Sequence, residues 1–569
     1  MHDYLSRQKL RVALLTITMF TYIGLTLVGP QLIRTFLDRA IAGNRTDTLI
    51  PIAVWFMVVA VLQQLFNVTA TYLAEQVGWT ATNEMRADLA AHVLDLDMGF
   101  HKEHTPGEMI ERIDGDVTAQ ADFFSAFAIR VLGNAILMVG VMVMLWLENV
   151  WVGFGITLFF VIAMGGMLRI QAWAVPLWKQ VRARSAELMG LVGEQLGGTE
   201  DIRGNGAVGY MLRRFTEILR AWLPDQIRGR IGFASLWATS IANYLVGTSV
   251  VFWLGWLFFG NGTLTLGSVY LIFSYTEITR RPMEQIREQM EKFQKAAAGI
   301  SRVQALFDRQ TALDTSGTVQ IPAGPLRVEI EDVVFGYDDD IVLDGVSLDL
   351  EAGHVLGVLG RSGSGKTTMA RLLTRLYDPL TGSVVLGGVE IRGADIHSLR
   401  RHVGMVTQDV QLFRATIRDN LTFFDESVSD ARLHEVLQEL GLDEWLSSMP
   451  DGLDTRLEAG GAGLSAGQAQ LLAFTRIFLE DPGLVILDEA SSRVDPATEK
   501  LLERAVDRLL QDRTGIIIAH RLATVTRADD ILILEDGEVI EYGARRALAA
   551  DPGSRLSHLL ITGMEEVLA

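Results

Sequence analysis

About six segments of the chain are apolar over roughly the 20 residues that a helix needs to cross the hydrocarbon core of a bilayer. They cover Val12–Ile33, Leu49–Leu73, Phe127–Leu147, Trp151–Ala172, Phe233–Phe259 and Leu264–Pro282. The first segment is too long for a cleavable signal peptide and has no small-residue cleavage pattern. The whole chain has an apolar content of 49%, which is high for a soluble protein, and the excess lies in the region of these segments. They predict an all-α polytopic transmembrane domain with six helices.

The connections between these segments alternate between short and long. "LENV" and "FGNGT" are short, whereas Glu75–Ser125 and Gln171–Ile231 are long, polar and typical of helices. The second long connection carries many basic residues, namely Lys179, Arg182, Arg184, Arg203, Arg213, Arg214, Arg220, Arg228 and Arg230. The positive-inside rule places that connection and both termini in the cytoplasm. We therefore expect a multi-pass protein of the cell membrane, and a prokaryotic cytoplasmic membrane is the favoured location.

Length and charge restrict the remaining possibilities. A chain of 569 residues exceeds one ordinary hydrophobic core, which favours at least two domains. The net charge of −19 argues against a nucleic-acid partner, and the lack of cysteine excludes disulfides, thiolate catalysis and cysteine metal sites. We expect the transmembrane domain at residues 1–310, a linker at 311–325 ending in "QIPAGPL", and a soluble α/β domain at 326–569.

Four short apolar runs of the soluble region read as strands buried on both faces of a parallel sheet: "HVLGVLG", "HVGMVTQ", "GLVILDE" and "GIIIAH". Each run ends in a glycine or a polar residue, namely Gly360, Gln408, Asp488 with Glu489, and His520. Ligands of open α/β sheets bind at the carboxyl ends of the strands. The four runs therefore predict one common site.

The first run leads into "GRSGSGKTT", which matches the phosphate-loop pattern G-x-x-x-x-G-K-[ST] and precedes a helical stretch. Its backbone N–H groups are expected to close on phosphates, Lys366 to reach the β and γ groups, and the Thr367 hydroxyl to bind Mg²⁺. The helix amino terminus adds a favourable potential for an anion. The predicted nucleotide-binding residues of this loop are Gly360, Arg361, Ser362, Gly363, Ser364, Gly365, Lys366, Thr367 and Thr368.

The other strand ends supply candidate catalytic groups. Asp488 is placed to hold Mg²⁺ through water, and Glu489 to orient or deprotonate the attacking water; the alternative is a solvated acidic pair. His520 is predicted to contact the γ-phosphate or the water and to steady the transition-state charge; the alternative is a structural histidine. Gln408 is predicted to reach the metal or the water. Tyr337 is predicted to stack on adenine, although an aromatic side chain on a strand face remains open.

These motifs, in this order and spacing, resemble a half-transporter of the ATP-binding cassette (ABC) exporter family over nearly the whole chain. The matching pieces are an A-loop at Tyr337, Walker A at Gly360–Thr367, a Q-loop at Gln408, the signature "LSAGQ", Walker B at Leu484–Asp488 with Glu489, the D-loop "SSRVD" and the switch His520. In the membrane half, "HKEHTPGEMIERIDGDV" resembles the segment around the first coupling helix, and "GEQLGGTEDIRGNGAV" the approach to the second.

The resemblance implies a dimer in which two cassettes meet head to tail and enclose two ATP molecules. Each ATP is then held by the Walker motifs of one chain and by the signature of the other. Ser465, Gly467, Gln468 and Asp495 are the residues that this implies on the partner-facing side. ATP binding would close the pair and turn the membrane helices outward, as a population shift between two states.

The signature departs from the family pattern at Ala466, where glycine is usual; its Cβ would penalise a positive φ and crowd close backbone approach. Further departures are "EAGG" at Glu458–Gly461, Ala469, Leu471, and Arg493 with Val494 in the D-loop. In heterodimeric family members such a signature often pairs with a partner that lacks the catalytic glutamate. We therefore expect a heterodimer with a second half-transporter, with a homodimer as the alternative.

Polar residues inside the spans should face the bundle interior or water, because burying them in lipid is expensive. They are Gln63, Gln64, Asn67, Asn134, Asn243, Glu277, Arg280 and Arg281. The last three form either a structural ion pair or a contact for a charged or amphipathic cargo. The leading functional hypothesis is ATP-driven export of an amphipathic small molecule, lipid or peptide. The alternatives are an exporter-like importer of a siderophore-like compound and an ATP-gated channel or regulatory subunit.

Overall fold

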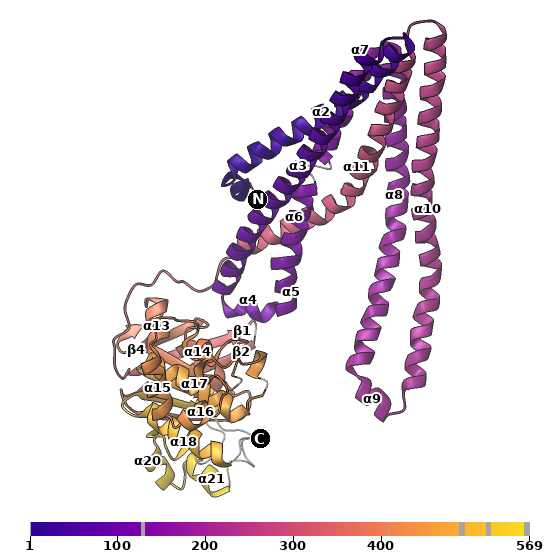
Figure 1. The fold of residues 1–569 in the computed structure, drawn as a ribbon. Helices are drawn as coiled ribbons and strands as arrows, with labels where there is room; N and C mark the ends of the chain where they lie inside the picture. The colour runs from indigo at the N-terminus through magenta and orange to yellow at the C-terminus, as the bar shows by residue number, and fades with distance from the viewer. Residues whose placement is uncertain are drawn as a thin grey trace. The chain divides into compact units, whose positions relative to one another are not determined.

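A computed structural model describes residues 2–126, 131–338, 340–408, 410–461, 463–488, 496–518 and 525–562. The chain forms two compact units (Figure 1). The first consists of Met1–Leu94 and Thr105–Arg309, and the second of Asp95–His104 and Gln310–Ala569. The second unit thus includes a short segment taken from within the amino-terminal half of the sequence.

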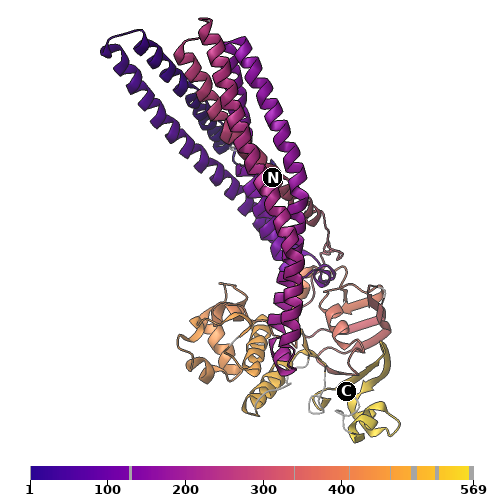
Figure 2. The same ribbon diagram turned by 90° about the vertical axis from the view of Figure 1, so that its right-hand side faces the viewer.

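The first unit is helical. Its elements are α1 (His2–Ser6), α2 (Lys9–Ile41), most of α3 (Thr46–Asp95), α5 (Pro106–Ile110), the π-helix η1 (Glu111–Asp116), α6 (Val117–Ala126), α7 (Asn134–Glu148), α8 (Val150–Gly197), α9 (Thr199–Gly204), α10 (Val208–Gly260) and α11 (Leu266–Phe307). In Figure 2 the indigo helices α2 and α3 meet at a short turn, and in Figure 1 α8 runs beside α10. The long connections predicted as helical are helical: the first continues α3 and then forms short helices up to α6, and the second extends α8 and α10 on either side of α9.

The structure bears out five of the six expected spans. Within the described ranges, five helices are long and apolar enough to cross a membrane: α2, α3, Val131–Glu148, α8 and α10. The sixth expected span opens α11, where Glu277, Arg280 and Arg281 interrupt the apolar stretch. The short "LENV" connection ends α7 and starts α8 at Asn149, because its side chain accepts hydrogen bonds from the N–H groups of Trp151 and Val152.

The second unit contains α4 (Met98–Glu103) and two sheets with their helices. One sheet has the order β2 (Asp340–Leu350), β1 (Val328–Tyr337), β4 (Thr381–Leu386), β5 (Val389–Glu390) and is antiparallel. The other has the order β10 (Glu538–Ala544), β9 (Asp530–Glu535), β3 (Val355–Leu359), β8 (Thr514–Ile518), β7 (Leu484–Asp488), β6 (Val403–Val406). The four predicted buried runs are β3, β6, β7 and β8, and they are parallel neighbours as expected.

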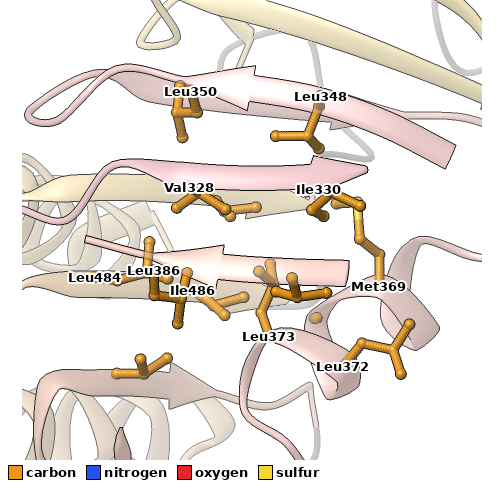
Figure 3. Packing of buried hydrophobic residues seen from close by; sticks show 14 of the residues in the cluster. Val328, Ile330, Leu348, Leu350, Met369, Leu372, Leu373, Leu386, Leu484 and Ile486 are labelled. Atoms are coloured by element: carbon orange, nitrogen blue, oxygen red, sulfur yellow. The ribbon is translucent and has the colours of Figure 1, made fainter. Parts of the chain in front are cut away.

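The helices of this unit are α12 (Lys366–Leu373), α13 (Ile396–His402), α14 (Ile417–Thr422), α15 (Asp430–Glu439), α16 (Asp443–Ser447), α17 (Ala466–Glu480), α18 (Pro496–Leu510), α20 (Arg545–Ala550) and α21 (Arg555–Thr562), with short 3₁₀ turns η3 (Gly452–Asp454) and η4 (Ala459–Gly461). Both sheets and α12 share one hydrophobic core. Figure 3 shows Met369, Leu372 and Leu373 of α12 with the strand side chains of this core. This packing fixes the start of α12 relative to the end of β3.

Candidate functional site

The loop between β3 and α12 has a backbone that glycine alone adopts easily. Gly360, Gly363 and Gly365 have φ values of 151°, 86° and 101°. A Cβ at Gly360 would lie 2.2 Å from the carbonyl oxygen of Leu534. The glycines therefore serve both the turn and the close approach of neighbouring backbone.

Two polar side chains of this loop, those of Ser364 and Lys366, are buried. Lys366 is 6% exposed, and its Nζ donates hydrogen bonds to the carbonyl oxygens of Gly360 (2.7 Å) and Arg361 (2.8 Å). The hydroxyl of Ser364 is buried and has no hydrogen-bond partner in the described part of the chain. A phosphate group fits this arrangement, because it would accept hydrogen bonds from Ser364 and Lys366.

The start of α12 meets the end of β7 through one hydrogen bond. Thr367 Oγ1 donates to Asp488 Oδ2 at 3.0 Å, and Asp488 is 6% exposed. These two oxygens are the ligand type that Mg²⁺ prefers, and Mg²⁺ normally takes its other ligands from substrate phosphates and water. The predicted metal residues Thr367 and Asp488 are therefore brought together.

The remaining strand-end candidates are only partly described. Gln408 lies just beyond β6, which ends at Val406, and is exposed. Glu489, Asp495 and His520 lie outside the described residues. The strands that lead to Glu489 and His520 are paired side by side, with Asp488 opposite Ile518.

Tyr337 ends β1 beside other aromatic rings. Its ring makes edge contacts with Phe335 (5.1 Å between centroids) and Tyr377 (5.3 Å). Its hydroxyl accepts a hydrogen bond from Arg371 at 3.1 Å.

One ring face of Tyr337 contacts Lys102 of α4. Lys102 Nζ lies 4.4 Å from the ring centroid and 3.8 Å from Asp338 Oδ2. No motif of the sequence indicated Lys102, although it lies within the segment that resembled the first coupling helix. The contact brings α4 to the position predicted to receive adenine.

Asp97 attaches the beginning of α4 to the linker. Its carboxylate accepts hydrogen bonds from the N–H of Phe100 (3.2 Å) and the N–H of Ala312 (2.8 Å). Burial alone would raise the pKa of Asp97, but the hydrogen bond from Ala312 and the one from Phe100 outweigh burial and hold that pKa below its ordinary value. Asp97 is thus an ionised cap that links α4 to the stretch that follows α11.

The signature segment forms the amino terminus of α17. Ser465 is the N-cap: its Oγ accepts from the N–H of Gln468 (3.2 Å), and its own N–H donates to Gln468 Oε1 (2.9 Å). Ala466 is the first residue of the helix and is not among the residues with positive φ. The expected penalty for positive φ at Ala466 is therefore wrong, because a helical backbone suits alanine.

Glycine is instead required just upstream of the signature. Gly460, Gly461 and Gly463 have φ values of 69°, 74° and 98°. The "EAGG" flank therefore keeps glycines where the chain must turn into α17, even though it departs from the family pattern.

The polar residues of the membrane spans fall into different environments. Gln63 donates to Thr26 Oγ1 (3.1 Å), and Asn134 donates to Gln285 Oε1 (2.7 Å). Arg280 Nε lies 3.7 Å from Glu277 Oε1, which is a loose ion pair at i,i+3 spacing. The side chain of Arg281 lies outside the described part of the structure, and Gln64 is exposed.

Two families and several relatives match the chain. The family described as "ABC transporter transmembrane region" matches residues 12–283, and that described as "ABC transporter" matches residues 343–492. The ATP-binding/permease protein YgaD of Bacillus subtilis (strain 168) is 30% identical over 553 residues, which are 94% of each chain. The ATP-dependent lipid A-core flippase of Idiomarina loihiensis is 28% identical over 98% of this chain and 97% of its own.

A solved structure shares the fold. The structure of a bacterial Atm1-family ABC exporter with ATP bound superposes with a TM-score of 0.80 and 24% sequence identity. The match covers 97% of this chain and 98% of the other. The arrangement of a helical unit followed by a two-sheet unit is therefore common to both proteins.

Proposed function

Because the chain belongs to the ABC transporter family, as an ATP-hydrolysing half-transporter of the exporter type in the membrane, we propose that it exports an amphipathic compound as half of a dimer. ATP binding and hydrolysis in the cytoplasmic domain supply the free energy. The cargo moves by alternating access between membrane helices. ATP is the proposed energy source, and Mg²⁺ is the ion proposed to bind with it.

The contact between Thr367 and Asp488 carries the proposal on the ATP side. It joins the first turn of α12 to the end of β7, so that a hydroxyl and a carboxylate share one position beside the phosphate loop. Bound Mg²⁺ would offset the charge of the β and γ phosphates. Lys366 would exchange its loop carbonyls for phosphate oxygens, and Glu489 would orient or deprotonate the attacking water.

The amino terminus of α17 supports a role at the partner's ATP. A helix N-terminus with an intact cap offers backbone N–H groups and a positive potential to an anion. Ser465, Gly467 and Gln468 would contact the γ-phosphate held by the other chain. Asp495 of the D-loop would belong to the same partner-facing side. We favour a heterodimer on the strength of Ala469, Leu471 and the D-loop departures alone, since Ala466 carries no backbone strain; a homodimer is the alternative.

The coupling between ATP and cargo requires that nucleotide binds two states of the dimer with different affinity. The α4 segment supports this link in the described residues, because Asp97 binds the linker and Lys102 contacts the ring proposed to hold adenine. Adenine stacking on Tyr337 would compete with Lys102 for the ring or trap it there. Either way, α4 would sense the nucleotide.

The test is reconstitution of the chain, with whichever partner co-purifies, in inside-out and right-side-out vesicles. We expect an amphipathic compound to stimulate ATP hydrolysis and to leave the cytoplasmic side only when ATP is present. Movement in the opposite direction would identify an importer, and ion conductance without cargo movement would identify a channel. Either result would overturn export.

Glu489→Gln provides the matched control for catalysis. The variant should bind ATP as tightly as the parent and lose nearly all turnover, because the amide cannot accept the water's proton. Binding is measured with a fluorescent ATP analogue and turnover by phosphate release. Robust hydrolysis by Glu489→Gln would show that another group is the base.

A further inference from the structure

Two cavities in the helical unit share one ion pair. The smaller lies between α8, α10 and α11, and the larger is lined by α2, α3, α11 and the stretch Gly133–Leu137. Glu277 and Arg280 line both. The smaller cavity has a volume of about 40 Å³, and the larger one about 580 Å³. The smaller one therefore has room for a compact group and the first part of a chain, and not for a whole lipid.

The walls of the smaller cavity combine aromatic rings with hydrogen-bond donors. Phe159, Phe160 and Phe273 supply apolar surface, and Tyr244 lies under the guanidinium of Arg280, 5.2 Å from its centroid. The Nδ2 of Asn243 is buried and has no hydrogen-bond partner in the described ranges. An unpartnered buried donor costs free energy, and a hydrogen-bond acceptor that reached Asn243 Nδ2 would remove that cost.

The larger cavity differs at one of its amide donors. Its amide donor Asn134 is satisfied by Gln285. In the smaller cavity Arg280 Nε lies 3.7 Å from Glu277 Oε1. This separation exceeds hydrogen-bond length, so Arg280 keeps donor capacity for a closer acceptor.

We propose that the smaller cavity binds the anionic group, carboxylate or phosphate, of an amphiphile, with Arg280 and Asn243 as donors and the aromatic rings against its first methylenes. The proposal rests on the proposed function in taking the bound amphiphile as the cargo. A cationic amphiphile suits the cavity less, because Arg280 already occupies the face of Tyr244 and counters Glu277. The unpaired N–H donor of Asn243 likewise cannot bind a cation.

Occupancy of the cavity can be measured directly because the chain contains no cysteine. Ser240→Cys places one thiol in the smaller cavity, and Asn67→Cys places one in the larger. The full chain, with the partner that co-purifies, is placed in nanodiscs and labelled with a maleimide in the presence of laurate, dodecyl phosphate, dodecyltrimethylammonium or dodecyl maltoside. The extent of labelling is measured on the gel band of this chain.

We expect laurate or dodecyl phosphate to slow labelling of Ser240→Cys at least fivefold, and the cation and the maltoside to slow it less than twofold. Comparison of the two anions tells a carboxylate site from a phosphate site. Adding Asn243→Leu to Ser240→Cys should raise about tenfold the anion concentration that gives half-maximal protection, which is the effect of one lost hydrogen bond to a charged group. Labelling of Asn67→Cys should be affected much less.

Asn243→Asp guards against misfolding of the leucine variant, since it keeps the size of the side chain. It should abolish protection by the anions and allow protection by the cation. Equal protection by cation and anion in the parent, or unchanged anion protection in Asn243→Leu, would overturn the anionic site. If anions protect the thiol but no amphiphile stimulates ATP hydrolysis or crosses the membrane, the anionic site stands and the export function fails. If a cation is transported and anions do not protect the thiol, the export function stands and the anionic site fails.

Discussion

The loop before α12 and the turn before α17 both contain glycine at the amino terminus of a helix, but they require it to different degrees. In the first, Gly360, Gly363 and Gly365 all have positive φ values, and Gly365 is itself the left-handed residue from which α12 starts. In the second, the cap is an extended Ser465 followed directly by helix at Ala466. An alanine is therefore damaging at position 365, where α12 starts, and ordinary at position 466, where α17 starts. A departure from a glycine motif is informative only where the backbone conformation demands glycine.

The largest effect is expected from Gly365→Ala. A Cβ there would lie 2.5 Å from Leu343 Cδ2 and 3.0 Å from the carbonyl oxygen of Val342, at a φ of 101°. We expect at least a ~100-fold loss of ATP affinity and a fall of about 2–4 kcal/mol in the free energy of unfolding. Binding of a fluorescent ATP analogue and thermal unfolding measure the two effects.

Gly363→Ala is the matched control for that variant. It has a φ of 86°, but nothing lies within 4 Å of the added Cβ. It should cost only the conformational strain, about 1–2 kcal/mol. Equal effects of the two substitutions would show that steric contact with β2 does not matter.

A smaller effect is expected from Thr367→Val, which keeps the shape of the side chain and removes the hydroxyl that bonds Asp488. We expect ATP hydrolysis to fall by about 10–100-fold and the Mg²⁺ concentration for half-maximal activity to rise. Thr374→Val, at the other end of α12, removes a hydroxyl that bonds only main-chain carbonyls. A magnesium titration unchanged in Thr367→Val would remove Thr367 from the metal site.

Ser465→Ala probes the second loop. It removes the acceptor for the N–H of Gln468 and opens the capping box, so α17 should lose about 1 kcal/mol. If Ser465 also contacts the partner's ATP, hydrolysis should fall by more than the fall in stability explains. Ser429→Ala, which removes the N-cap of α15 away from the signature, gives the stability loss alone. Equal hydrolysis in the two variants would leave Ser465 with a capping role only.

Much of this architecture follows from the sequence, for reasons that specific residues illustrate. Continuous apolarity at Leu484–Leu487 marks a strand buried on both sides, and the pattern around Lys366 marks a strand, loop and helix, because each signal is local. The contact of Lys102 with Tyr337 joins residues far apart in the chain, and no local pattern encodes it. The conformation at Ala466 was predicted wrongly because a glycine in a motif was taken to imply positive φ.

The smallest effect is expected from Ala466→Gly, and it bears on the partner chain. Restoring the usual glycine at the first position of α17 should lower stability by a few tenths of a kcal/mol to about 1 kcal/mol, since glycine has more freedom to lose in a helix. Hydrolysis by the purified dimer should change less than twofold, because the backbone there is already helical. A several-fold gain in hydrolysis would mean that the methyl group crowds the partner's nucleotide. The altered signature would then mark a weakened site and strengthen the case for a heterodimer.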